Sequence, residues 1–224
     1  MRLWFRRLFC VAVIIFYFFF IRRWMNTRGA EDSEVDEDLS GDWILGDKLR
    51  ATMAINLLRS VDEAWPWIAQ MGRGAGYYAC DYIINGNRTS ADYVLKDLPP
   101  PTVGDRNRIL GKIEEVEEKS SVTWIREGRN HPFGSLDHRL TYHLKPRGLG
   151  ACRLLIRSTL DYRGPCGPVL AMIFEPIKFL FITKQISRIK QLTESYEARN
   201  DEQKINRYLA GNHQGDKAHF SRKG

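Results

Sequence analysis

The stretch WPWIAQMGRGAGYY, Trp65–Tyr78, places two tryptophans around a proline and then runs through three glycines into a tyrosine pair. It is preceded by Ser60 and Glu63, whose spacing is that of a capping box at the start of a helix. Gly72 is expected to end this helix, and the glycines let the chain change direction before a second short helix over residues 77–84. The stretch therefore predicts a joint between two helices.

The same glycines do not form a phosphate cradle. A dinucleotide-binding turn needs Gly-x-Gly-x-x-Gly between a strand and a helix, whereas these glycines leave a helix and have a different spacing. The sequence also contains no Gly-x-Ser-x-Gly elbow and no P-loop. These patterns exclude the common nucleotide-binding and serine-hydrolase motifs.

The excess of positive charge lies at the N-terminus. The chain of 224 residues has a formal charge of +7, but residues 1–28 hold six arginines and neither an acid nor a lysine. The remainder has 28 basic and 27 acidic residues. Because that part lacks the basic face that neutralises phosphates, no nucleic-acid partner is expected.

The N-terminal segment is apolar. Leu8–Ile21 carries no charge and is flanked by two arginine pairs, and a helix over residues 3–24 is long enough to span a bilayer. The pattern predicts a single-pass membrane anchor over residues 1–28. A cleaved signal sequence is the alternative, although no small-residue cleavage site follows, and an interfacial or buried helix is another. Lys48 and Arg50 add slightly more positive charge downstream, which favours a cytoplasmic domain.

The rest of the chain divides into three parts. Residues 29–41 are acidic and are expected to form a solvated linker, and residues 199–224 are expected to be a disordered tail. Between them, residues 42–198 form the predicted domain. Its periodicity predicts strands over residues 51–58, 108–116, 122–127, 136–144 and 152–162, a proline-containing loop over 87–105, and a long amphipathic helix over 168–198 with a bend or break at Pro176.

The strand over residues 136–144 alternates regularly. Its faces carry Leu136, His138, Leu140, Tyr142 and Leu144 on one side and Asp137, Arg139, Thr141 and His143 on the other. Such a sheet is expected to have one apolar face and one face in water, on which Asp137 and Asp161 would lie. The last helix has the stripe needed to cover the apolar face. We therefore predict an α+β fold in which a curved antiparallel sheet and a helix enclose an apolar cavity.

The segment VDEAWPWIAQMGRGAGYYACDYI, Val61–Ile83, is similar to the opening motif of the polyketide cyclase/dehydrase and lipid-transport proteins of the START/Bet v 1-like (SRPBCC) superfamily. VGD at residues 103–105 and FEPIKFLFITKQISRIKQLTE at 174–194 also resemble that family. The turn is shorter than in the family motif, so Arg73 is offset, and Ile84 replaces an acid. The resemblance implies a helix-grip fold with a hydrophobic-ligand cavity between the sheet and the C-terminal helix, without implying one reaction.

Candidate ligand-binding residues follow from these patterns. They are Trp67, Tyr78, Trp124, His138, Tyr142, Ile156, Phe174 and Phe181. His138 is the candidate acid, base or hydrogen-bond donor. His143 lies on the opposite face of its strand, and Cys10, Cys80, Cys152 and Cys166 lack ligand spacing, so no metal and no cofactor are expected.

Three functional hypotheses remain open. The first is a membrane-anchored protein that binds a hydrophobic small molecule or lipid. The second is a cyclase/dehydrase-type enzyme that uses His138. The third is a membrane-tethered interaction module whose cavity is filled by its own side chains. The sequence does not indicate an oligomeric state.

Overall fold

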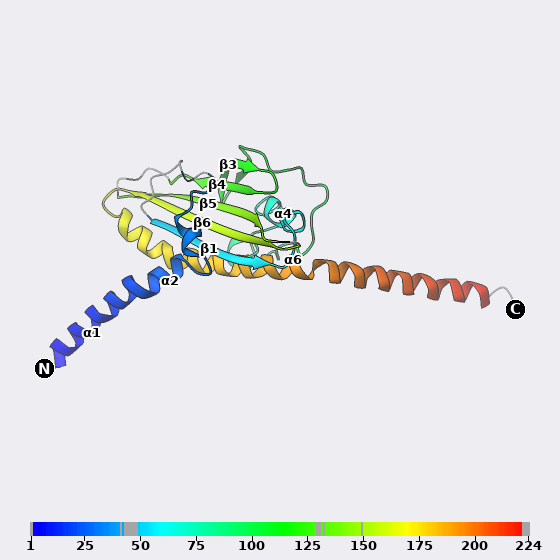
Figure 1. Ribbon diagram of the computed structural model, residues 1–224, viewed down its shortest axis with the longest axis horizontal. Helices are drawn as coiled ribbons and strands as arrows, with labels where there is room; N and C mark the ends of the chain where they lie inside the picture. Colours follow the sequence, from blue (N-terminus) through cyan, green and yellow to red (C-terminus); the bar gives the residue numbers. More distant parts are fainter. Residues whose placement is uncertain are drawn as a thin grey trace.

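The computed structural model describes residues 2–40, 42, 49–128, 131, 133–148 and 150–220. Its centre is a six-stranded antiparallel sheet in the order β1-β6-β5-β4-β3-β2, beneath which α6 runs (Figure 1). The strands are β1 (Leu49–Leu57), β2 (Arg106–Asn107), β3 (Gly111–Glu117), β4 (Ser121–Arg126), β5 (Ser135–Pro146) and β6 (Cys152–Arg163). The helices after β1 are α4 (Val61–Ala69), α5 (Asp81–Ile84) and α6 (Gly167–Phe220). The predicted α+β, helix-grip architecture is confirmed.

The predicted capping box starts α4. Ser60 Oγ accepts from the Glu63 amide, and the Glu63 carboxylate accepts from the Ser60 amide at 2.8 Å. The helix buries Trp65, Trp67 and Ile68 in the core. The second predicted helix is shorter than expected, because the backbone turns left-handed at Tyr78 and Cys80 and helix forms only from Asp81.

The core lies between the sheet and α6. Ile182, Ile186, Ile189 and Leu192 of α6 are buried in the same cluster as the sheet residues. The helix passes through Pro176 without a break. It also continues to Phe220, where the sequence predicted a disordered tail from residue 199; no proline after Pro176 interrupts this segment.

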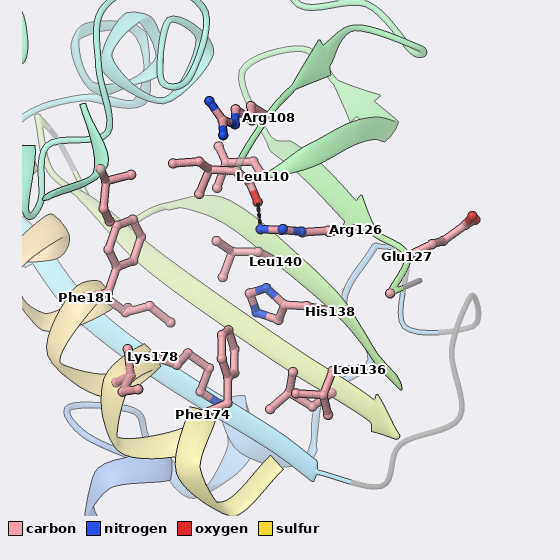
Figure 2. A pocket seen from close by; sticks show the side chains of 16 residues that line it. Arg108, Leu110, Arg126, Glu127, Leu136, His138, Leu140, Phe174, Lys178 and Phe181 are labelled. Carbon is pink, nitrogen blue, oxygen red and sulfur yellow. Dashed lines mark hydrogen bonds between the residues drawn. The ribbon is translucent and has the colours of Figure 1, made fainter. Parts of the chain in front are cut away.

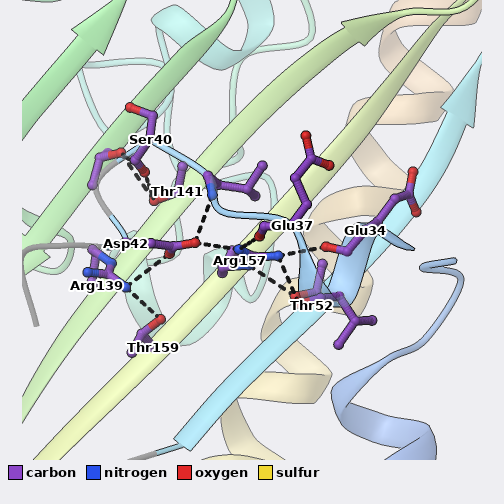
Figure 3. A network of polar contacts seen from close by, with 12 residues as sticks. Glu34, Glu37, Ser40, Asp42, Thr52, Arg139, Thr141, Arg157 and Thr159 are labelled. Carbon is purple, nitrogen blue, oxygen red and sulfur yellow. Dashed lines mark hydrogen bonds and ion pairs between the residues drawn. The ribbon is translucent and has the colours of Figure 1, made fainter. Parts of the chain in front are cut away.

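The other face of the sheet is not exposed to water as predicted. Asp137 and Arg139 of β5 are only 5% and 1% exposed. The acidic segment that includes α3 (Asp32–Asp36) lies across this face and buries Glu34 (Figure 3). The alternation of side chains was correct, but the polar face is covered by part of the same chain.

Arginines of the sheet bind this acidic segment (Figure 3). Arg157 of β6 is completely buried, pairs with Asp42 and donates to the carbonyl oxygens of Glu34 and Val35 at 2.6 and 3.2 Å. Arg139 donates to Asp42 at 3.1 Å. Buried charges need such partners, and these contacts hold the segment on the sheet.

The N-terminal helices are α1 (Arg2–Phe16), a π-helical turn at Tyr17–Ile21, and α2 (Arg22–Asn26). Among them, α2 lies beside α6, and α1 leads away from the domain (Figure 1). One described helical span, Arg6–Asn26, is long and apolar enough to cross a membrane, and a signal sequence would have the same properties.

The chain leaving α2 follows the edge of β1. The Ala54 amide donates to the Arg28 carbonyl oxygen at 3.2 Å. Gly29 comes so close to this strand that a Cβ atom on it would lie 2.3 Å from the Ala54 oxygen. Only glycine fits here without moving the strand.

Candidate functional site

A cavity of about 730 Å³ lies between the sheet and the first turns of α6 (Figure 2). Its lining is mainly aliphatic and aromatic, with a few charged side chains. The lining residues are Ile84, Arg108, Ile109, Leu110, Arg126, Glu127, Gly128, Leu136, His138, Leu140, Leu160, Phe174, Ile177, Lys178, Phe181 and Ile182. A concave, largely apolar site of this size is typical of small-molecule binding.

The structure brings three of the predicted site residues together around this cavity. They are His138 of β5 and Phe174 and Phe181 of α6. The other five lie in the packed core and do not line this cavity: Trp67, Tyr78, Trp124, Tyr142 and Ile156. Ile84, at a position where the sequence resemblance led us to expect an acid, does line it and contributes an apolar side chain to this wall.

His138 is held in the cavity wall by the sheet. Its Nε2 lies 2.9 Å from Ser158 Oγ on the neighbouring strand β6, and its ring contacts Phe174 edge-on with 5.4 Å between centroids. Burial, together with the charges of Lys178, Arg126 and Arg139, lowers the pKa of His138 to about 3. The imidazole is therefore neutral at physiological pH.

Tyr142 is bonded within the core. Its hydroxyl donates to Gln185 Oε1 at 2.7 Å, and Gln185 Nε2 donates to the Tyr77 carbonyl oxygen at 2.8 Å. Burial raises the pKa of Tyr142, so the phenol stays protonated. These hydrogen bonds join the sheet, α6 and the glycine-rich joint. Tyr142, a candidate ligand-binding residue from the sequence, therefore uses its hydroxyl within the core.

The tyrosine pair of the joint also has internal partners. Gln70 Nε2 donates to Tyr78 Oη at 2.5 Å, and Gln70 Oε1 accepts from the Leu95 amide at 2.9 Å. Asp81 accepts from the Ser90 amide and hydroxyl at 2.8 and 2.6 Å. These bonds attach the proline-containing loop to the helices.

Arg73, on the other side of the joint, also binds the proline-containing loop. It donates to the carbonyl oxygens of Pro99 and Pro100 at 2.9 and 3.1 Å and pairs with Asp105 at 3.0 Å. The segment from Trp65 to Asp81 thus builds one end of the domain, and its residues Gln70, Arg73 and Asp81 form hydrogen bonds with the loop.

Lys178 also lines the cavity, although it is not among the candidate residues that the sequence indicated. It follows Phe174 by four positions and precedes Phe181 by three. That spacing places all three on one face of a helix. The structure shows Lys178 4% exposed between α6 and the sheet, beside Phe174 (Figure 2).

The carboxylate nearest to Lys178 in the sequence is bound elsewhere. Glu175 accepts from Arg22 Nε and Nη2 of α2 at 2.8 and 3.0 Å, and from Asn26 at 3.4 Å. Lys178 Nζ has no hydrogen-bond partner among the described residues. Burial lowers the pKa of Lys178 to about 8, which the charge of Glu175 partly opposes.

Within the part of the chain that the structure describes, no group of three or more His, Cys, Asp or Glu side chains is arranged to hold a metal ion. The class of protein defined by fold and site is therefore a helix-grip-like α+β domain with an apolar cavity that carries a buried ammonium group.

Comparisons with known proteins give structural neighbours only. No family model and no curated protein sequence matches the chain. Protein MLL2253 from Mesorhizobium loti is 14% identical with a TM-score of 0.40, over 64% of this chain and 96% of that one. Protein Ms6760 from Mycobacterium smegmatis is 16% identical with a TM-score of 0.39, over 70% and 95%. The di-domain ARO/CYC BexL from the BE-7585A biosynthetic pathway is 12% identical with a TM-score of 0.37, over 65% and 46%.

Proposed function

We propose that this chain is a membrane-anchored protein of the START/Bet v 1-like type that binds a hydrophobic small molecule or lipid in the cavity between the sheet and α6. The observation that carries the proposal is the cavity itself, whose volume is about 730 Å³ and whose walls include Leu136, Leu140, Leu160 and Phe181. Burying apolar ligand surface there contributes about 25 cal/mol per Å². The open volume also favours binding over a module that fills its own cavity.

The first turns of α6 support attachment to a bilayer. Val169, Met172, Ile173 and Leu180 are between 44% and 59% exposed. This apolar surface lies next to α2, whose Trp24 ring is 5.3 Å from that of Phe179 on α6. An exposed apolar patch that continues from a candidate membrane helix suits contact with lipid. Resistance of the full chain to alkaline carbonate extraction tests the anchor, and release into the soluble fraction contradicts it.

The state of His138 favours binding over acid–base catalysis. A general acid or base works best with a pKa near the working pH, whereas the pKa of His138 is lowered to about 3. The neutral ring and the Ser158 hydroxyl instead offer a fixed polar pair in the wall of the cavity. We assign them a role in orienting the ligand.

Filling the cavity tests the binding proposal. The Leu136→Trp variant places extra volume in the wall, and the matched Leu58→Trp variant changes a residue that is 69% exposed and does not line this cavity. We expect Leu136→Trp to lower the amount of co-purified apolar ligand about tenfold, since overpacking costs on the order of 1–3 kcal/mol. Mass spectrometry of organic extracts from the full-length proteins measures it. Equal amounts from both variants, or no ligand in the parent, would contradict the proposal.

A further inference from the structure

The buried Lys178 side chain destabilises the ligand-free protein. An ammonium group removed from water loses its hydration, and buried lysines are normally paired with an acid or bonded to oxygen acceptors. Lys178 is 4% exposed, and its Nζ has neither kind of partner among the described residues. It lines the cavity proposed to hold the ligand. A group that enters the cavity from outside would be able to reach this ammonium group.

The local geometry explains why the protein does not supply this partner. Glu175 and Lys178 are three positions apart on α6, a spacing at which opposite charges commonly pair. Both oxygens of Glu175 instead accept hydrogen bonds from Arg22. This arrangement leaves Lys178 as a positive charge inside an apolar wall.

The remaining charged groups favour an anion. Arg108 and Arg126 also line the cavity and are exposed, as is Glu127, the one acid among the described lining residues. Arg126 Nη1 donates to the Ile109 carbonyl oxygen at 3.1 Å (Figure 2). Three cationic side chains and one carboxylate give the cavity a net positive lining, which attracts negatively charged molecules.

We propose that Lys178 receives the acidic group of the ligand, so that the natural ligand is an amphipath with an apolar body and one anionic group, either a carboxylate or a phosphate. This inference rests on the proposed binding function. Leu140, Leu160 and Phe181 then contact the apolar body, and the ammonium group forms a charge-assisted hydrogen bond. Such a bond contributes about ten- to a hundredfold in affinity.

The test measures equilibrium binding of dodecanoate, dodecyl phosphate and dodecanol to the full chain in nanodiscs of neutral lipid, with empty nanodiscs subtracted. We expect one of the two anions to bind at least about tenfold more tightly than dodecanol, and the preferred anion identifies the acid class. Lys178→Met should abolish this preference and leave dodecanol binding unchanged or stronger. Lys178→Arg should retain part of it.

Lys184→Met is the matched control, because Lys184 lies on the same helix and is exposed. It should leave the preference unchanged. Lys178→Met should also raise the thermal midpoint of the ligand-free protein, since it removes an unpaired buried charge, and this shows that the variant folds. An unchanged anion preference in Lys178→Met overturns the Lys178 assignment while dodecanol binding upholds the cavity. Failure of all three probes to bind overturns the binding function and this inference with it.

Discussion

At the scale of single residues, the cavity combines two basic groups with different protonation states. His138 is neutral because burial and neighbouring positive charges lower its pKa to about 3, whereas the pKa of Lys178 falls only to about 8. The lysine therefore remains mostly charged at neutral pH. One group can accept or donate a neutral hydrogen bond, and the other supplies the charge.

The pKa of His138 has a consequence for stability. A histidine with a lowered pKa binds its proton in the unfolded chain from about pH 6.5 downward but in the folded chain only near pH 3, so acidification favours unfolding between these values. We expect the free energy of unfolding to depend less on pH in His138→Gln than in the parent. The difference in slope should reach up to about 1.4 kcal/mol per pH unit between about pH 6 and pH 4.

Denaturant unfolding of the full chain at several pH values measures this difference. His131→Gln, at an exposed position, is the control and should follow the parent. Parallel pH profiles for the parent and His138→Gln would show that the pKa of His138 is not lowered on folding.

At the scale of elements, local patterns predicted the strands well and their surroundings poorly. Alternation along residues 136–144 and the capping box at Ser60 depend on neighbouring residues, and both were confirmed. The burial of Arg157 could not be predicted in this way, because its partner Asp42 lies 115 positions away. Lys178 was missed for a related reason: helical spacing placed it beside Phe174, but only the fold shows that Glu175 pairs with Arg22.

Because the polar face is covered, we expect substitution of a buried arginine on this face to lower stability more than substitution of an exposed arginine. Arg157→Met removes one of the two buried arginines that bind Asp42 and leaves the carbonyl oxygens of Glu34 and Val35 without this donor, which we expect to destabilise the fold by about 3–5 kcal/mol. Arg147→Met removes an ion pair with Glu31 whose side chains are 50% and 58% exposed, and should cost at most about 1 kcal/mol. Chemical denaturation of both variants provides the comparison. Similar losses in the two would mean that the acidic segment does not depend on Arg157.

At the scale of the whole molecule, the Arg22–Glu175 ion pair joins α2 to α6, the helix that carries the cavity residue Lys178. Arg22→Met frees Glu175, which can then pair with Lys178 three positions away. We expect the preference for the anionic probe over dodecanol to fall severalfold. Arg23→Met removes the same charge from an exposed neighbour and should not change it. Equal binding profiles for the two variants would show that the Arg22–Glu175 ion pair does not affect the ligand site.

The segment that follows α2 affects whether many copies of the protein aggregate when they are crowded together. Strands at a sheet edge present unpaired amide and carbonyl groups that can recruit strands from other chains. Arg28 and Gly29 occupy this position along β1, with a backbone hydrogen bond to Ala54. Tethering to a membrane would raise the local concentration of such edges. The segment that leads to the N-terminal helix thus also blocks lateral strand pairing at β1, so crowding on a surface would not in itself lead to aggregation through this edge.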